Sequence, residues 1–552
     1  MRRTPIAFVI ALLIVVAAAG TAIARSGSSD SQANQPQVAG DATSNTSARF
    51  PTNKQNEPTV AITPDGTNAI AGSNDEQKQP PCGPGPVRGA TAAANNCSFF
   101  PGVGTSGVYT STDAGATWTN LGLLPGYTDT GSSVAPPAGA LATSTAQGTL
   151  VSDGDPVVVF GPKPDAAGTF SWANGARAYY ANLAAYSSSA TQGQQAPELL
   201  AVSISDSYGA TWYDPVLAVA TNGYIFNDKE DIWADRNPAS PFFGRVYLSW
   251  TQFRDFAGGA EPVMFSYSAD GGLTWSAPNQ LSIAQNYAFG GRQGSVVRSG
   301  PDGTVYAMWE DSDLNGYKHV VQTSADGGRT WSKTMTIAYN TDIAAAIPGA
   351  KFRTDSFASA GVDPTSGAVY AAWSSAASGS GRIVVSRSAD HGQTWSAPVT
   401  VSSAREGYAF FQGLDVAPNG RVDVGYQALI ATDPTTYGTG NAAIDSYYVS
   451  STDGGRTWSK PVKVSSASSD PAASAQNNFQ LQFWGDYNTV ASTNSSVLFI
   501  YTDSRSGVGC PAVDAYQHGL DGTGPAVAKP APGNVCPAQF GNTDAYVSKI
   551  TP

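Results

Sequence analysis

The sequence predicts an all-β protein in which four-stranded antiparallel sheets are repeated around a ring. An octapeptide of the form Ser-x-Asp-x-Gly-x-Thr-Trp recurs six times in the 552 residues. The copies are STDAGATW (111–118), SDSYGATW (205–212), SADGGLTW (268–275), SADGGRTW (324–331), SADHGQTW (388–395) and STDGGRTW (451–458). Successive tryptophans are 94, 63, 56, 64 and 63 residues apart, about the length of one four-stranded sheet with its loops. No long segment of helical periodicity competes with this interpretation.

Each unit repeats a frame of four strands. An innermost strand is followed by a turn, a second strand that often ends in an aromatic residue, a third strand that enters the octapeptide and a fourth that leaves it. The second strands align as VYLSW (246–250), VYAMW (305–309), VYAAW (369–373), VDVGY (422–426) and VLFIY (497–501). Units begin near Glu57, Asp155, Lys229, Gly294, Ser356, Gln412 and Asp486.

This frame predicts seven units, and six is the alternative if the irregular second unit (154–220) is miscounted. An open edge strand would invite aggregation, so the ring should close. The segment from Arg49 to Thr52 is the candidate for the missing outer strand of the last unit.

The octapeptide has the chemistry of a turn clamp. Its carboxylate can accept hydrogen bonds from backbone N–H groups, its glycine supplies a positive φ, and its tryptophan buries a large apolar surface. The second copy has Ser207 where the carboxylate is expected, with Asp206 one place earlier. We expect that turn to be held less well.

The octapeptide is the Asp box, or BNR repeat, so the chain resembles the sialidase-like β-propeller superfamily. The boxes run from residue 111 to 458, and the frame around them covers residues 47 to 550. The resemblance implies a single β-propeller with its boxes on the face away from the active site, so the box carboxylates are expected to be structural. Sialidases have six blades, whereas the frame predicts seven.

The N-terminal residues have the pattern of a secretory signal. Arg2 and Arg3 precede an apolar stretch from Pro5 to Ala24. We therefore predict a signal peptide over 1–24, a flexible linker over 25–48, which is rich in small polar residues, and the propeller over 49–552. The predicted location is extracellular, and an uncleaved N-terminal membrane anchor is the alternative.

Composition excludes some partners. Charged residues make up 13% and the net charge is −12, with no basic run, so nucleic acid is not an expected partner. After cleavage of the signal we expect a monomer without a membrane partner. His319, His391 and His518 lie outside the predicted site, which disfavours a Ser-His-Asp triad. No cofactor is expected, although the Asp-rich turns leave a structural Ca²⁺ open.

The four cysteines fit an oxidising compartment. Cys82 and Cys97 are 15 residues apart, and Cys510 and Cys536 are 26 apart. Two local disulfides are therefore the natural choice among three possible pairings.

Charged and aromatic residues recur in the loops that lead into the innermost strands and in those that follow the second strands. These include Glu57, Asp155, Asp228, Lys229, Glu230, Arg292, Arg353, Asp355, Tyr408, Trp484, Asp486, Tyr487, Asp75, Glu310 and Asp503. We predict a polar central funnel of mixed charge that suits an anionic or polyhydroxylated ligand. The alternative is that these charges pair with one another, or bind water and Ca²⁺, to fill the channel.

The resemblance implies roles for some of these residues. In sialidases three arginines hold the substrate carboxylate, an Asp is the general acid/base, and a Tyr activated by a Glu is the nucleophile. The candidate arginines are Arg49 (in Ala48-Arg49-Phe50-Pro51), Arg292 and Arg353. The candidate acid is Asp75 or Asp155, and the candidate nucleophile is Tyr487 with Glu230 or Glu310. Lys229, Trp484 and Asp486 are further candidates for substrate binding.

These expectations favour an exo-acting glycoside hydrolase on glycans that contain sialic or uronic acid. A secreted propeller that binds glycans or proteins without turnover is the alternative, and a polysaccharide lyase is another.

Overall fold

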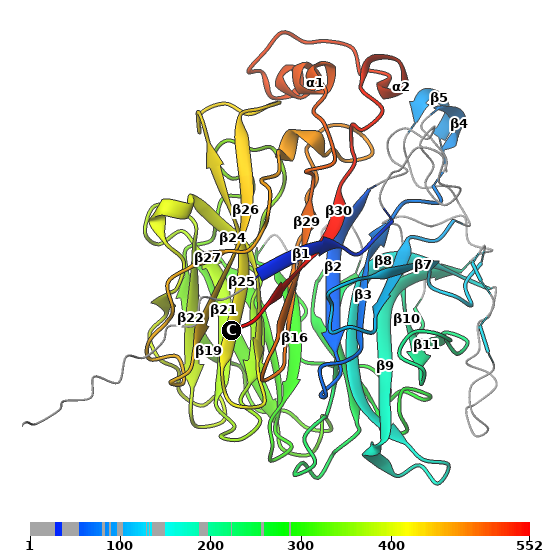
Figure 1. The fold of residues 1–552 in the computed structure, drawn as a ribbon, viewed down its shortest axis with the longest axis vertical. Helices are drawn as coiled ribbons and strands as arrows, with labels where there is room; N and C mark the ends of the chain where they lie inside the picture. The colour runs from blue at the N-terminus through cyan, green and yellow to red at the C-terminus, as the bar shows by residue number, and fades with distance from the viewer. Residues whose placement is uncertain are drawn as a thin grey trace, which may run out of the picture.

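The computed structural model describes residues 28–35, 54–79, 83–87, 90–96, 103–128, 130–131, 133–134, 149–186, 197–221, 223–254, 259–285 and 289–552. Seven four-stranded antiparallel sheets stand around one axis (Figure 1). The protein is therefore a β-propeller with seven blades, which confirms the predicted fold class and the higher blade count.

The blades follow the order of the chain, and each begins with its innermost strand. Blade 1 contains β2 (Gln55–Ile62), β3 (Ala69–Asp75), β6 (Ser106–Ser111) and β7 (Thr119–Leu123). Blade 2 contains β8 (Leu150–Pro164), β9 (Phe170–Tyr186), β10 (Leu199–Ser205) and β11 (Val216–Val219). Blade 3 contains β12 (Ile225–Ala234), β13 (Val246–Arg254), β14 (Val263–Ser268) and β15 (Asn279–Gln280). Blade 4 contains β16 (Arg292–Ser299), β17 (Val305–Asp313), β18 (Gly316–Ser324) and β19 (Met335–Asn340).

The remaining three blades complete the ring. Blade 5 contains β20 (Ser359–Val362), β21 (Val369–Ser375), β22 (Arg382–Ser388) and β23 (Val399–Thr400). Blade 6 contains β24 (Tyr408–Val416), β25 (Val422–Ala431), β26 (Ala442–Ser451) and β27 (Val462–Lys463). Blade 7 contains β28 (Thr489–Ser492), β29 (Val497–Asp503), β30 (Asp544–Ile550) and β1 (Ser28–Gln32). A separate hairpin joins β4 (Gly83–Val87) to β5 (Ala90–Asn96).

Blade 7 is built from both ends of the chain. Its outer strand β1 pairs antiparallel with β30, from Ser28 opposite Ile550 to Gln32 opposite Tyr546. The linker prediction for 25–48 is therefore wrong at these residues. An outer strand is held mainly by backbone hydrogen bonds, so a stretch of small polar residues can form one. The predicted closing segment, Arg49 to Thr52, lies outside the described residues.

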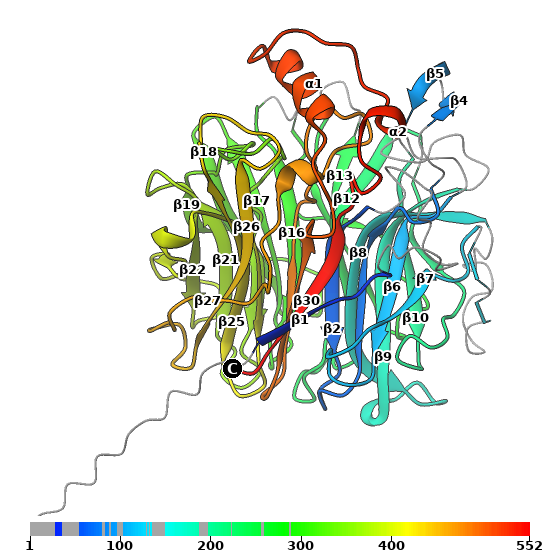
Figure 2. The same cartoon turned by 45° about the horizontal axis from the view of Figure 1, so that its top comes forward.

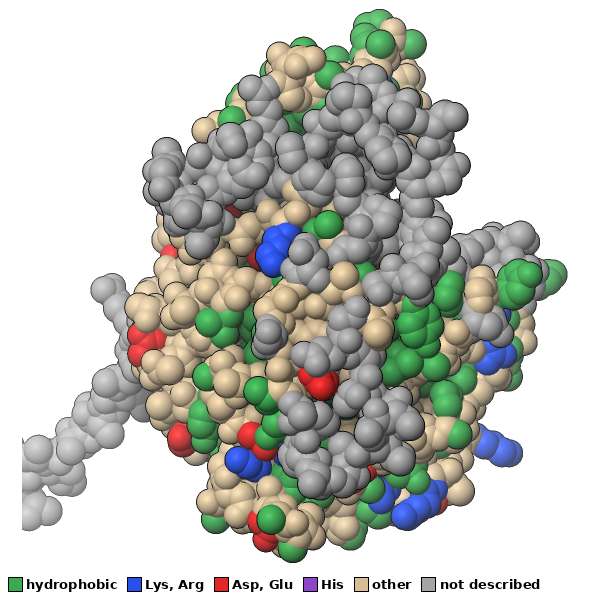
Figure 3. Space-filling view, turned by 90° about the vertical axis from the view of Figure 1, so that its right-hand side faces the viewer, with side chains coloured by type: hydrophobic (Ala, Val, Ile, Leu, Met, Phe, Trp, Pro, Cys, Tyr) green, Lys and Arg blue, Asp and Glu red, His purple; other side chains and the backbone are tan. Residues whose placement is uncertain are grey.

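Apolar packing between neighbouring blades holds the described ring together. One buried cluster lies at each of its seven interfaces. Between blades 4 and 5, for example, Met308 packs with Val369 and Trp373. Trp250, Trp309 and Trp373, which end the predicted second strands, are fully buried. Large aromatic side chains thus fill the widening space between twisted sheets. Charged side chains are scattered among uncharged ones on the side shown in Figure 3.

The Asp boxes clamp turns at the end of each third strand. In the fourth box, Asp326 Oδ1 accepts from the N–H groups of Arg329 (3.0 Å) and Thr330 (2.9 Å), and the Thr330 hydroxyl donates to Oδ2 (2.7 Å). Ser324 Oγ accepts from the Gly328 N–H at 2.9 Å. The carboxylate therefore acts as the predicted structural acceptor.

The second box keeps this arrangement without a carboxylate. Ser207 Oγ accepts from the Thr211 N–H at 2.8 Å, and Ser205 Oγ accepts from the Gly209 N–H at 2.9 Å. The displaced Asp206 instead pairs with Arg177 at 2.7 Å. The expectation of a poorly held turn is corrected, because a serine hydroxyl reaches the same backbone donor.

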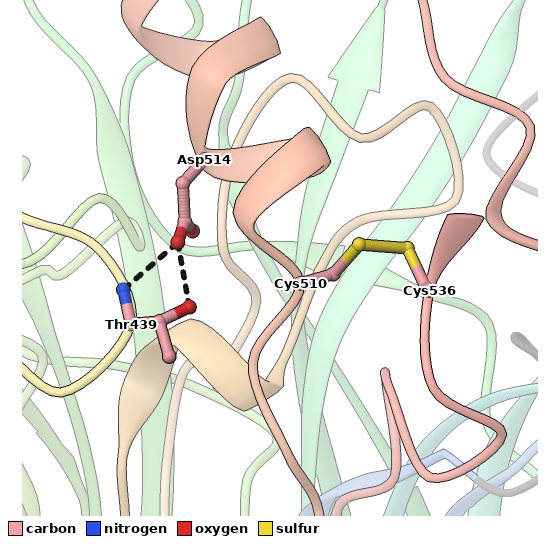
Figure 4. Close-up of a disulfide and its surroundings, with 4 residues drawn as sticks. All are labelled: Thr439, Cys510, Asp514 and Cys536. Carbon is pink, nitrogen blue, oxygen red and sulfur yellow. Dashed lines mark hydrogen bonds between the residues drawn. A yellow bond between two sulfur atoms is a disulfide. The ribbon is translucent and has the colours of Figure 1, made fainter.

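A helical cap lies on the face opposite the boxes (Figures 1 and 2). It contains α1 (Pro511–Asp521) and α2 (Pro532–Val535), and the Cys510–Cys536 disulfide ties the two together (Figure 4). Asp514 of α1 accepts from the N–H and hydroxyl of Thr439 in blade 6 at 2.9 and 2.6 Å. This disulfide confirms one predicted pairing, whereas Cys82 and Cys97 lie outside the described residues.

Within the described ranges no helix is long and apolar enough to cross a membrane. The predicted signal segment, 1–24, lies outside those ranges.

Candidate functional site

Five innermost strands carry a β-bulge at the same position. The register shifts in blades 1, 2, 3, 4 and 6. The residue at each shift has a positive φ: Glu57 (53°), Asp155 (51°), Lys229 (53°), Gly294 (63°) and Phe411 (46°). Bulges re-aim side chains and are common beside functional sites. These five lie where the innermost strands begin, on the face away from the boxes.

Carboxyl groups from blades 1, 2, 3 and 7 meet around the axis. We call Glu57, Asp155, Asp228, Asp486 and Arg353 the axial cluster. The Asp155 side chain is hydrogen-bonded to the side chains of both Glu57 and Asp228. Arg353 donates to both carboxylate oxygens of Asp486, at 2.8 and 2.5 Å, and its Nη2 lies 4.0 Å from Glu57 Oε1.

Two members of the axial cluster favour the protonated form. Burial, followed by the charges of Asp155 and Asp486, raises the pKa of Glu57 well above its usual range. Burial and the charge of Asp155 raise the pKa of Asp228 in the same way. A hydrogen bond between two carboxyl groups needs a proton on one of them. The contacts of Asp155 with Glu57 and Asp228 therefore fit a cluster that shares protons.

Tyr487 lies beside this cluster in surroundings that oppose its ionisation. Lys229 Nζ lies 3.4 Å above the centre of the Tyr487 ring, a cation–π contact. Burial and the charges of Asp155 and Glu57 raise the pKa of the Tyr487 phenol. A phenolate nucleophile is therefore disfavoured, and the neighbouring carboxyl groups are better candidates.

A cavity lies next to the axial cluster, of which Asp486 forms part of the wall. Its lining includes Lys229, Asp355, Gln412, Asp486 and Tyr487.

Towards the box face the channel is filled by ion pairs. Arg298 pairs with Asp231 at 2.6 Å and Arg236 with Asp415 at 3.2 Å. Both guanidinium groups stack on the Trp233 ring. Paired charges of the predicted kind thus cross the lower channel, where Arg298 and Asp231 also line the axial cavity and Arg236 and Asp415 line a second one.

Three predicted site residues are buried away from a ligand. Asp75 is fully buried and accepts from Gln55, Tyr109 and the Gln77 N–H, each at 2.9 Å. Trp484 is fully buried, and its indole N–H donates to Gln427. Its ring cannot stack on a sugar. Glu230 is buried, and burial and the Asp155 charge raise its pKa, which makes it a protonated neighbour of the cluster.

The two described arginines of the predicted triad have different partners. Arg292 is buried, donates to the Gly290 carbonyl at 3.1 Å and lies 3.5 Å from Asp311. Arg353 belongs to the axial cluster. Arg49 lies outside the described residues. Of the three, the structure brings only Arg353 to the axis.

Glu310, the alternative partner of Tyr487, belongs to a second acidic group with Asp342 and Asp355. Sequence reasoning placed Glu57 and Asp228 in the funnel without a role, and it missed Asp342. An acidic residue before proline at the same position in two units, Glu57-Pro58 and Asp155-Pro156, is the signal that identifies the axial pair.

A comparison with known families supports the repeat. Residues 182–417 match the family described as BNR repeat-like domain. No protein of curated function matches the chain.

Solved structures with a similar fold include a protein of unknown function from Dyadobacter fermentans. It is 14% identical, the match covers 71% of this chain and 93% of that one, and the TM-score is 0.41. A GH93 α-L-arabinofuranosidase of Fusarium graminearum is 12% identical, with 76% and 96% covered and a TM-score of 0.41. The Hadza microbial sialidase Hz136 is 15% identical, with 72% and 71% covered and a TM-score of 0.39. The chain thus carries a BNR repeat-like domain within a seven-bladed propeller, as the Asp boxes predict.

Proposed function

We propose that the protein is a glycoside hydrolase whose reaction takes place at the axial cluster. The observation that carries this proposal is the group of carboxyl side chains Glu57, Asp155 and Asp228, close to Asp486, which lines a cavity. Glycoside hydrolysis generally needs one protonated carboxylic acid and one carboxylate, about 5–10 Å apart on either side of the scissile bond. Glu57 and Asp228 favour the protonated form and Asp155 is the candidate carboxylate, so a substrate that enters between them must displace the contacts of Asp155 with these two groups.

Each group has a role that follows from its surroundings. Glu57 and Asp228, whose pKa values are raised, hold the proton that the leaving oxygen needs. Asp155, which bonds to both, is the candidate nucleophile or base. Asp486 fixes Arg353, so that its guanidinium group contacts the site in one orientation.

The charge balance favours an uncharged sugar. Five carboxyl groups surround the axis (Glu57, Asp155, Asp228, Glu230 and Asp486), against the two described cations Lys229 and Arg353. Because the pKa values of Glu57, Asp228 and Glu230 are raised, their protonation leaves two carboxylates facing the two cations, so the site offers no excess positive charge to a substrate carboxylate.

An acidic glycan is the second candidate, because the Arg353 side chain is 44% exposed and a substrate carboxylate that displaced Asp486 would find the same two guanidinium donors. The filled lower channel favours attack at chain ends, since a glycan cannot thread through the ring. We place the activity outside the cell, where the Cys510–Cys536 disulfide would persist.

The test is turnover by the purified full chain on fluorogenic neutral glycosides, sialosides and uronosides. Glu57→Gln and Asp155→Asn should each lower kcat about 10²–10⁴-fold. Asp302→Asn, on the box face with a side chain 46% exposed, is the matched control and should leave kcat unchanged.

Absence of turnover by the folded wild type on all three substrate classes would reject the hydrolase. Glycan binding without turnover would then support the non-catalytic alternative. Release of unsaturated uronic acid products would instead identify a lyase.

A further inference from the structure

A second group of carboxyl side chains lies between blades 4 and 5, apart from the axial cluster. Glu310 belongs to β17, Asp342 follows β19, and Asp355 precedes β20. One oxygen from each of these side chains lies within 4.8 Å of the others. We propose that Glu310, Asp342 and Asp355 bind a divalent cation and that this cation is Ca²⁺.

The spacing of the oxygens matches calcium. Ca²⁺ binds oxygen at about 2.3–2.6 Å, so ligands on opposite sides of one ion are separated by about 4.6–5.2 Å. The three oxygens, all within 4.8 Å of one another, therefore fit around one Ca²⁺. Mg²⁺ usually keeps several waters and is bound through one or two carboxylates, so a site of three carboxylates favours Ca²⁺.

Two buried polar groups at this position have no hydrogen bond within the described structure. Glu310 is 6% exposed, and its Oε2 has no partner. His319 lies opposite Glu310 in the β17–β18 register, is fully buried, and has no partner on either ring nitrogen. The distance of 4.0 Å from His319 Nε2 to Glu310 Oε2 is too long for a hydrogen bond. A ligand at Glu310 would supply the partner that the protein does not.

His319 cannot neutralise the carboxylates. Its ring is fully buried against Trp373 at a centroid distance of 4.6 Å, and its Nε2 is too far from Glu310 for a hydrogen bond. Arg353, two residues before Asp355 in the chain, forms its closest ion pair with Asp486 instead. The three carboxyl groups therefore depend on protons or on a bound cation for neutralisation.

Neighbouring donors orient the ligands. The Ser356 hydroxyl donates to Asp342 Oδ1, and the Ser356 N–H donates to Asp355 Oδ1 at 2.7 Å. Asp355 also lines the axial cavity, which places the ion beside the proposed substrate site. The cation site does not depend on the proposed activity and can be tested without substrate.

The test is binding of Ca²⁺ to the full chain after treatment with EDTA. Tb³⁺, which replaces Ca²⁺, should bind at this site and luminesce. The charges of all three carboxyl groups act on Tyr317, so this ring is near enough to sensitise the bound Tb³⁺. Ca²⁺ should displace Tb³⁺ with a stoichiometry of one and should raise Tm. Glu310→Gln and Asp342→Asn should each weaken Ca²⁺ binding about 10-fold or more, since affinity follows ligand charge. Asp302→Asn on the opposite face should bind like the wild type.

Circular dichroism establishes that each variant is folded. Asp342 is only partly buried, so Asp342→Asn keeps the test decisive if Glu310→Gln fails to fold. Absence of binding to the folded wild type at millimolar Ca²⁺, or unchanged binding by Asp342→Asn, would overturn the proposal. Binding of Mn²⁺ or Zn²⁺ but not Ca²⁺ would overturn the assignment of the ion.

Discussion

The N-terminal strand β1 should contribute measurably to the stability of the ring, and Asn34 provides the most direct perturbation. Asn34 is 3% exposed. Its Nδ2 donates to Gln55 Oε1 and to Asp544 Oδ1, both at 3.0 Å, and its Oδ1 accepts from the Ala545 N–H at 2.9 Å. One side chain thus joins the N-terminal segment to blades 1 and 7.

Asn34→Ala leaves these three partners without their hydrogen bonds. Each buried polar group left unsatisfied costs about 1–3 kcal/mol. Gln32 still donates to Asp544 at 2.7 Å, so part of the loss is offset. We expect a decrease of about 3 kcal/mol in the free energy of unfolding. With an unfolding entropy of about 2 cal/mol/K per residue, this decrease lowers Tm by about 3 °C.

Urea denaturation and thermal unfolding, each followed by tryptophan fluorescence, measure this change. Asn315→Ala, at an exposed hairpin between β17 and β18, is the control and should stay within about 0.5 kcal/mol of the wild type. Equal stability of the two variants would refute the docking of residues 28–35 and restore the linker interpretation.

Three further changes test other parts of the molecule. Cys510→Ser opens a loop of 26 residues and should lower the free energy of unfolding by about 3 kcal/mol. A reductant should destabilise the wild type equally. Equal stability of the variant and the wild type would mean that the cap docks without its disulfide. Burial raises the pKa of Asp544 to about 7 in the folded protein, against 3.8 unfolded, so wild-type stability should fall as pH rises from 4 to 7. Asp544→Asn removes this dependence and should exceed the wild type in stability at pH 8 but not at pH 4; parallel pH profiles would contradict the assignment. Glu57→Gly should unfold with a free energy within about 1 kcal/mol of the wild-type value, because glycine suits a φ of 53°. The same variant should lose turnover. Retained turnover would exclude Glu57 as the acid.

The sequence predicts the ring well because its signals are local. The predicted second strands at 305–309 and 497–501 begin where β17 and β29 begin, at Val305 and Val497. Alternating apolar residues and a terminal aromatic identify a strand from its own residues. The Asp boxes add a turn at a known place in each unit. Seven blades therefore follow from counting frames.

Elements that depend on distant partners could not be predicted in this way. β1 has the composition of a linker, and only the free edge of β30, more than 500 residues away, makes it a strand. The helix α1 is short and lies between two cysteines, so it gives no long helical periodicity by which the sequence could reveal it. His319 was excluded from the funnel because it lies in a third strand, yet the β17–β18 register places it opposite Glu310. Such proximity depends on register, which a single sequence does not specify.

The backbone conformation at the bulges indicates that the acidic residues there have a functional role. A positive φ is disfavoured by about 1–2 kcal/mol for a residue with a side chain, and glycine avoids this penalty. Blade 4 has Gly294 at the bulge, whereas blades 1 and 2 have Glu57 and Asp155. Packing does not require these acids, since the same bulge forms around Gly294. The burial of Glu57 also raises the cost of its ionisation, as its raised pKa indicates. Two separate free-energy penalties at the same position are best accounted for by the chemistry of carboxyl groups at the axis.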